Sequence, residues 1–170
     1  MGGADPLGLT QTVVEAISGV DRPDIHWDIV LGPASAIDKR EVGPASGFQR
    51  QDSPPPHSEQ FYFHDGATLG RDGFLSMLSE SDIVVSNGGT TLYESLALGR
   101  PTISVPQNEF ESAVVDQLAG VGACMKGDIA KAIMELLNDQ KRRAGLSDKG
   151  SSLIDGKGCE RLAGLILSRI

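Results

Sequence analysis

The chain has 170 residues, of which 39% are hydrophobic and 22% charged, and this balance favours one folded domain over a disordered segment. Its formal net charge of −8 argues against binding to nucleic acid or to an anionic membrane. No apolar run is long enough to cross a bilayer, and the first residues lack the basic and apolar regions of a signal peptide.

The two cysteines, Cys124 and Cys159, are far apart and have no metal-type partner spacing. We interpret both as buried, reduced thiols of a cytoplasmic protein. The sequence indicates neither a metal site nor a cofactor.

The apolar pattern alternates between helical and strand periodicity along the chain. It predicts strands at 27–31, 61–64, 82–86, 102–105 and 123–125, and helices at 10–19 and 90–98 and around Phe74, Val115, Ile133 and Ile166. The stretch 43–58 is rich in Gly, Pro and Ser and is expected to be an exposed, flexible loop.

This alternation predicts an α/β fold, a Rossmann-like, doubly wound parallel sheet formed by the single domain 1–170. Ligands of such sheets bind outside the carboxyl ends of the strands. Gly2 and Gly3 should follow a strand and open the first helix, yet only Met1 precedes them. The first strand is therefore expected to be truncated.

The turn Asn87-Gly88-Gly89-Thr90-Thr91 joins a predicted strand to a predicted helix. Glycines permit a sharp turn and a close backbone approach, and the first N–H groups of a helix can bind a phosphate without a cationic side chain. An anion site is one interpretation. The other is a tight turn in which Thr90 or Thr91 caps the helix.

Glu94 follows Thr90 by four residues and Thr91 by three, so the three side chains share one helix face. A carboxylate one turn below a diphosphate site can accept hydrogen bonds from a ribose diol. Alternatively, Glu94 is a surface residue that complements the helix dipole.

The segment "NGGTTLYESLALGRPTISVPQNE" resembles the nucleotide-binding segment in the C-terminal half of GT-B nucleotide-sugar enzymes. The likeness is greatest to the family of PseG, a UDP-sugar hydrolase, and SpsG, a spore-coat polysaccharide protein, and MurG is more distant. "MGGADPLGLT", "IVLGP" and "IDGKGCERLAGLI" resemble further segments of that family, so the resemblance covers nearly the whole chain.

The resemblance implies a UDP or UDP-sugar ligand and assigns roles to particular residues. The diphosphate would contact Gly88, Gly89, Thr90 and Thr91, and the ribose would contact Glu94. The uracil would face His64, Asp65 and Gly66, and Gly2 and Gly3 would line the same cleft. Asn108 would lie near the sugar, although the family's following Gln is Glu109 here.

In that family the N-terminal domain carries a Gly-x-Gly-His type motif, which this chain lacks. We therefore expect no catalytic residue here, an isolated chain without activity, and a partner N-terminal domain in cis or in trans. The alternative is a non-catalytic nucleotide-sugar sensor or a vestigial partner subunit. A dinucleotide-binding Rossmann domain is disfavoured, because Gly2-Gly3-Ala4-Asp5-Pro6 lacks the G-x-G-x-x-G spacing.

Overall fold

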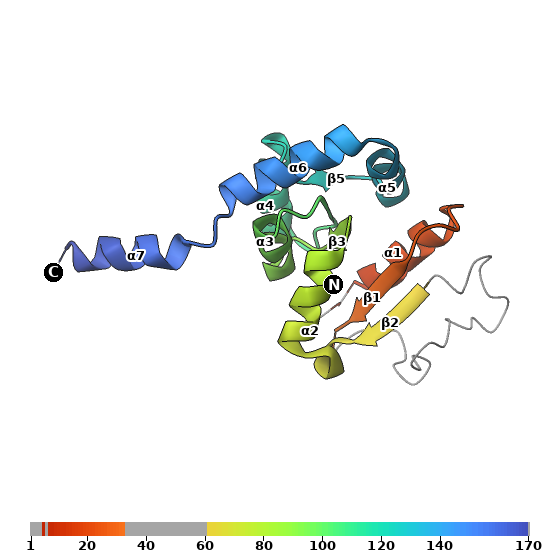
Figure 1. Ribbon diagram of the computed structural model, residues 1–170, viewed down its shortest axis with the longest axis horizontal. Helices are drawn as coiled ribbons and strands as arrows, with labels where there is room; N and C mark the ends of the chain where they lie inside the picture. The colour runs from red at the N-terminus through yellow and green to blue at the C-terminus, as the bar shows by residue number, and fades with distance from the viewer. Residues whose placement is uncertain (1–4, 6, 33–60, 170) are drawn as a thin grey trace.

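The computed structural model describes residue 5, residues 7–32 and residues 61–169 (Figure 1). The N-terminal part contains α1 (Leu9–Ser18), β1 (Trp27–Leu31), β2 (Phe61–Asp65) and α2 (Gly66–Glu80). The rest contains β3 (Val84–Ser86), α3 (Thr90–Ala97), β4 (Thr102–Ser104), α4 (Glu109–Gly120), β5 (Met125–Lys126), α5 (Ile129–Asn138), α6 (Gln140–Leu153) and α7 (Gly158–Leu167).

The described strands are parallel, as predicted, but their hydrogen bonds form two small sheets rather than one continuous sheet. β1 pairs with β2, with Trp27 opposite Phe61 and Leu31 opposite Asp65. The second sheet has the order β3-β4-β5. β1 and β3 are consequently both edge strands.

Two apolar clusters hold these elements together. The larger one joins α1, β2, β4, α5 and α6 through Ile17, Phe61, Ile103, Ile133 and Leu146. The smaller one packs α3 on α4, where Leu92, Leu96 and Val115 are fully buried. The α3 cluster fixes the position of the turn that precedes it, because Leu92 lies in the first turn of that helix.

Helix α6 is absent from the predicted elements. Its sequence has two glycines and many polar residues, and Leu146 and Gly150 are its buried positions. Gly150 lets α6 approach α3 closely, since a Cβ there would lie 3.0 Å from Cδ2 of Leu96. Tertiary packing therefore forms this helix although its apolar periodicity is weak.

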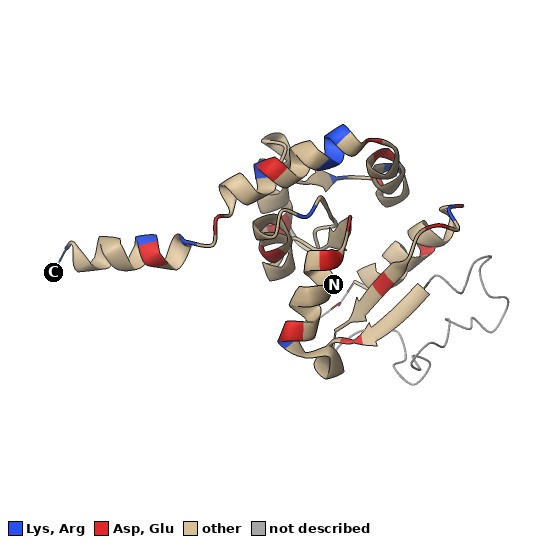
Figure 2. Ribbon diagram, in the orientation of Figure 1, with Lys and Arg blue, Asp and Glu red and all other residues tan. Residues whose placement is uncertain are grey.

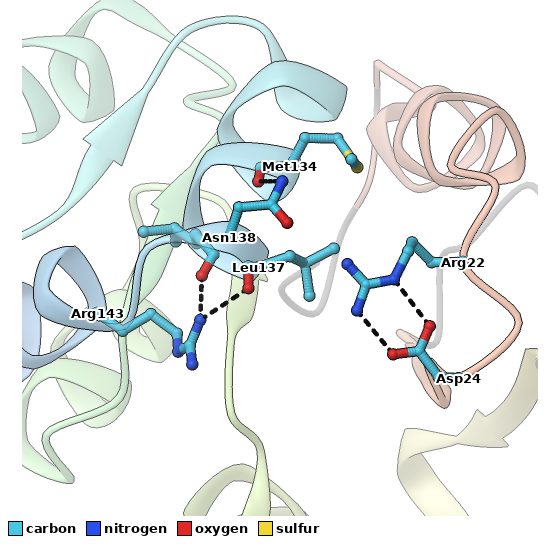
Figure 3. A network of polar contacts seen from close by, with 7 residues as sticks. Arg22, Asp24, Met134, Leu137, Asn138 and Arg143 are labelled. Atoms are coloured by element: carbon cyan, nitrogen blue, oxygen red, sulfur yellow. Dashed lines mark hydrogen bonds and ion pairs between the residues drawn. The ribbon is translucent and has the colours of Figure 1, made fainter.

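The junction of α5 and α6 is fastened by one basic side chain (Figure 3). Nη1 of Arg143 donates to the carbonyl oxygens of Leu136 and Leu137, the latter at 3.1 Å. A cation at these carbonyls also complements the negative end of the α5 dipole.

The last helix, α7, extends away from the body of the molecule (Figure 1), and all of its described residues are exposed. Leu162, Leu165 and Ile166 remain accessible to solvent. The expectation of two buried thiols is half correct. Cys124 is buried, and its burial raises the pKa of the thiol to about 11, whereas Cys159 on α7 is exposed.

The other predicted helices and strands are present, with ends that differ by a few residues. The predicted loop 43–58 and the predicted site residues Gly2 and Gly3 lie outside the described residues. Within the described part of the chain, no helix has the length and apolar character needed to span a membrane.

Asp5 caps α1. Its Oδ1 accepts from the N–H of Leu9 at 2.7 Å and its Oδ2 from the N–H of Thr10 at 2.9 Å. Burial by itself raises the pKa of this carboxyl, but the hydrogen bonds from Thr10 and Leu9 outweigh burial, so the pKa lies below its ordinary value of 3.8. The N–H groups in the first turn of α1 are therefore already bonded to a carboxylate of the same chain, that of Asp5.

We expect Asp5→Ala to lower the free energy of unfolding by about 0.5–2 kcal/mol near neutral pH. Because the folded-state pKa is depressed, this stability is present above the ordinary pKa of 3.8 and disappears as the pH falls through the folded-state pKa. Urea unfolding at several pH values measures the difference between wild type and variant. Asp5→Asn is the control, since it keeps a cap without a charge. A difference for Asp5→Ala that is constant over this pH range would contradict the assignment.

Candidate functional site at the turn between β3 and α3

The turn after β3 exposes the beginning of α3. Ser86 ends the strand, and α3 begins at Thr90 after the N-cap Gly89, whose backbone is extended. No side chain caps this helix, in contrast to α2, α4, α5 and α6. The first N–H groups of α3 are therefore donors at the positive end of the helix dipole.

Glu111 of α4 closes the other side of the turn. Its Oε2 accepts from the N–H of Gly88 at 3.1 Å and from the N–H of Gln107 at 2.8 Å, and Nδ2 of Asn87 lies 3.4 Å from its Oε1. One carboxylate thus ties the segments after β3 and β4 together. The N–H of Gly88, one of the predicted phosphate contacts, thus donates to Glu111 in this structure.

Three buried side-chain polar atoms of the described residues have no hydrogen-bond partner, and all lie at the carboxyl ends of β3 and β4. They are Oδ1 of Asn87, Oγ of Ser104 and Nε2 of Gln107. Asn87 is 6% exposed and Ser104 1% exposed, so water satisfies them poorly. Unpaired buried polar groups are costly, and their clustering beside a helix N-terminus is typical of a site that binds a polar ligand.

Packing against α4 by itself accounts for a glycine at position 88. A Cβ at this position would lie 2.7 Å from Cβ of Glu111 and 3.1 Å from Cγ2 of Val115. Gly88 is not in the left-handed region, so the contact with α4 explains the glycine.

We expect Gly88→Ala to destabilise the protein by about 1–3 kcal/mol, because the added methyl group overpacks the contact with α4. Gly145→Ala is the matched control: a Cβ at Gly145, inside α6, meets nothing within 4 Å. That control should be neutral or stabilising by up to about 1 kcal/mol. Denaturant unfolding of both variants measures the difference, and equal stability of the two would contradict the packing argument.

Glu94 lies in the middle of α3, with its side chain 20% exposed. Its Oε1 is 3.7 Å from Nη2 of Arg71, which belongs to α2 and is 76% exposed. α3 itself carries no Lys or Arg (Figure 2). Arg71 therefore brings an exposed cation to a site where Glu94 and Glu111 are negative.

The predicted uracil-facing residues have local structural roles. Oδ1 of Asp65 caps α2 by accepting from the N–H of Ala67 at 3.0 Å. Gly66 allows α2 to start against β1, since a Cβ there would lie 3.0 Å from the carbonyl oxygen of Leu31. Gly66 and Thr91 line one cavity of about 340 Å³. The structure thus places the beginnings of α2 and α3 on a shared cavity.

His64 has a carboxylate partner that its sequence neighbours do not reveal. Its Nε2 lies 2.7 Å from Oδ1 of Asp28 on the adjacent strand β1, and His26, stacked on Tyr62, lies 3.3 Å from the same oxygen. A carboxylate accepts only, so Nε2 of His64 carries the proton. The imidazole of His64 is thus directed at Asp28, and the backbone of His64 and Asp65 pairs with β1.

Asn108, the predicted sugar-binding residue, caps α4. Its side-chain oxygen accepts from the N–H of Glu111 at 2.9 Å. The pattern Asn108-x-x-Glu111 is a capping-box spacing, in which a carboxylate at the third helical position reaches back toward the N-cap. This spacing is the sequence signal that could have identified Glu111 as a residue of the turn. The hydrogen bond between Glu111 and Gly88, which are 23 residues apart, has no such signal in the sequence.

Comparisons with known proteins support the fold. No family model matches the chain. It is 24% identical over 98% of its length to the spore coat polysaccharide biosynthesis protein SpsG of Bacillus subtilis. It is 27% identical over 68% of its length to an uncharacterized protein of Methanocaldococcus jannaschii. The crystal structure of the glycotransferase of kitacinnamycin superposes on 98% of the chain with a TM-score of 0.65 and 23% identity.

The chain has the α/β fold of a glycosyltransferase, similar to the GT-B type, and the predicted fold class is confirmed. It spans 48% of SpsG, 21% of the archaeal relative and 40% of the glycotransferase. It therefore corresponds to about half, or less, of each of these proteins.

The geometry of the site suits a polar, anionic ligand. Backbone donors begin α3, a donor on Gln107 and an acceptor on Asn87 lie beside them without partners, and a carboxylate follows one turn later. The described residues contain no group of three or more His, Cys, Asp or Glu arranged to hold a metal ion.

Proposed function

We propose that the chain is the nucleotide-sugar-binding half of a glycosyltransferase-like enzyme in surface polysaccharide or nonulosonate biosynthesis, and that its ligand is UDP or a UDP-sugar. The observation that carries this proposal is the uncapped start of α3 beside the unpaired polar atoms of Asn87 and Gln107. The match to SpsG over 98% of the chain supports the biosynthetic role.

In this proposal the diphosphate accepts hydrogen bonds from the N–H groups of Gly89, Thr90 and Thr91. Gly88 is not among these donors because its N–H donates to Glu111. A carboxylate beside a phosphate is unfavourable, yet Glu111 is held by three donors of the turn. Its charge is therefore partly neutralised before a ligand arrives. Arg71 can turn from Glu94 toward the phosphates, since its side chain is 76% exposed.

Glu94 accepts from the ribose hydroxyls in this proposal, and the backbone at His64, Asp65 and Gly66 faces the base. Asn108 caps α4 in the structure and contacts the sugar only if its amide nitrogen, which is not used by the cap, reaches it. Catalysis of hydrolysis or transfer needs groups from a second domain, supplied in cis or in trans.

Titration of the purified chain with UDP, CMP, NAD and UDP-sugars tests the proposal. UDP and UDP-sugars are expected to bind and NAD is not. Equal affinity for CMP and UDP would contradict both the base assignment and the contact with a second phosphate, because the two ligands differ in their base and in their number of phosphates. Steady release of UDP from a UDP-sugar by the chain alone would contradict the need for a second domain.

A further inference from the structure

The side-chain amide of Asn87 is oriented by Glu111. A carboxylate accepts hydrogen bonds and does not donate them, so Asn87 turns its NH₂ group toward Oε1 of Glu111, at 3.4 Å. The opposite orientation would place the amide oxygen against a negative charge. Glu111 is itself held by the N–H groups of Gly88 and Gln107. The amide oxygen of Asn87 is therefore directed away from Glu111.

This amide oxygen lies beside the beginning of α3. A Cβ at Gly89, the N-cap residue of α3, would lie 3.3 Å from Oδ1 of Asn87 and 3.4 Å from its Nδ2. The backbone of Asn87 is fixed as well, because Oγ of Ser86 donates to its carbonyl oxygen at 3.0 Å. Asn87 is 6% exposed, and its Oδ1 accepts no hydrogen bond within the protein. A buried acceptor thus lies next to the backbone donors that begin α3.

The acceptor on Asn87 does not suit a phosphate. The ionised oxygens of a diphosphate accept hydrogen bonds, whereas Oδ1 of Asn87 needs an O–H or N–H donor. Gln107, which is bonded to the same carboxylate of Glu111, has an unpaired donor in Nε2, and Oγ of Ser104 can donate or accept. A hydroxyl group both donates and accepts. The unpaired atoms together therefore match a hydroxyl-bearing group rather than a second anion.

We propose that Asn87 recognises the sugar of the nucleotide-sugar, with Oδ1 accepting from one sugar hydroxyl and Nε2 of Gln107 donating to it. This inference rests on the proposed function, in which the ribose binds Glu94 and the base faces residues 64–66. The sugar hydroxyls are the donors of the ligand that remain. Asn108, which the sequence assigned to the sugar, uses its side-chain oxygen to cap α4.

Titration calorimetry of the full chain tests the role of Asn87 with UDP-glucose and with the methyl ester of UDP, which has the same charge and no sugar hydroxyl. Wild type is expected to bind UDP-glucose at least about fivefold more tightly than the methyl ester, because the hydroxyl pairs with an acceptor that is already desolvated. Asn87→Ala should remove this preference and change the affinity for the methyl ester less than about twofold. Asn138→Ala is the matched control, since that amide donates to the carbonyl oxygen of Met134 within α5, and it should keep the preference.

Deoxyfluoro analogues of UDP-glucose identify the hydroxyl. Fluorine in place of the hydroxyl at C2, C3, C4 or C6 of the glucose removes one donor. One of these analogues is expected to bind wild type like the methyl ester. It should lose almost nothing further against Asn87→Ala, because both changes delete the same contact.

The outcomes separate this inference from the proposed function. A folded wild type that binds neither UDP-glucose nor the methyl ester would remove the proposed function and the sugar contact with it. Binding of both with equal affinity overturns the sugar contact alone. A lower melting temperature of Asn87→Ala with an unchanged preference would assign Oδ1 to an internal bond from Gln107 and also overturn it. If Asn87→Ala does not fold, the fluorinated series on wild type decides, and four analogues that all bind like UDP-glucose contradict the contact.

Discussion

Replacing Glu111 by alanine is expected to lower the free energy of unfolding by about 2–4 kcal/mol. The substitution leaves the N–H groups of Gly88 and Gln107 without their acceptor, and both segments are partly or fully buried. The connection between the turns after β3 and β4 is lost with it. Denaturant unfolding measures the change. A loss below about 0.5 kcal/mol, typical of surface sites, would show that the carboxylate does not hold the turn.

Glu111→Gln separates the structural from the electrostatic role of this side chain. Its amide oxygen can still accept from Gly88 and Gln107, and its NH₂ group can donate to Oδ1 of Asn87 if that side chain turns over. The cost in stability should therefore be less than half that of alanine. Because one negative charge leaves the site, UDP should bind about five-fold more tightly. Weaker binding of UDP would contradict the proposed position of the phosphates.

Replacing Glu94 by alanine is expected to weaken UDP binding by roughly 10- to 150-fold, because charge-assisted hydrogen bonds to the ribose are worth about 1.5–3 kcal/mol. Glu94→Gln, which keeps the size of the side chain, controls for packing, since the carboxylate is only 20% exposed. Titration calorimetry measures both variants, and thermal melting confirms that they fold.

The ribose assignment has an independent check with a 2′,3′-dideoxy analogue of UDP. The analogue should lose a similar factor against wild type and almost nothing further against Glu94→Ala, because both changes delete the same contact. If Glu94 only complements the helix dipole, the variant loses about 0.3–1 kcal/mol of stability and binds UDP like wild type. Equal affinity for UDP would therefore reduce Glu94 to a structural residue. Arg71→Ala tests the cation paired with it.

The sequence predicted most of the fold because each element carries its own local signal. The bounds predicted for β1 are those observed, and α3 begins at the predicted Thr90. α6 was missed because its apolar periodicity is weak and its buried contacts, Leu146 and Gly150, are made by tertiary packing. The separation into two sheets was also unforeseen, since hydrogen bonding between strands is not encoded in any one segment.

The candidate site was predictable only in its local part. The turn before α3 and the place of Glu94 within that helix follow from local patterns, and the structure has α3 at Thr90–Ala97. The partners of these residues come from elsewhere in the chain: Glu111 for Gly88, Arg71 for Glu94 and Asp28 for His64. Such contacts depend on how helices and strands pack, and a single sequence carries no periodic signal for them.

Thermal melting with and without UDP tests the central claim most directly. At about 100 times its dissociation constant, a ligand that binds only the folded state adds about 2.7 kcal/mol of stability, which raises the melting temperature of a chain of this size by roughly 5–10 °C. We expect this shift with UDP and none with NAD. A folded sample whose melting temperature does not change in millimolar UDP would contradict the assignment of the turn between β3 and α3 as a nucleotide site.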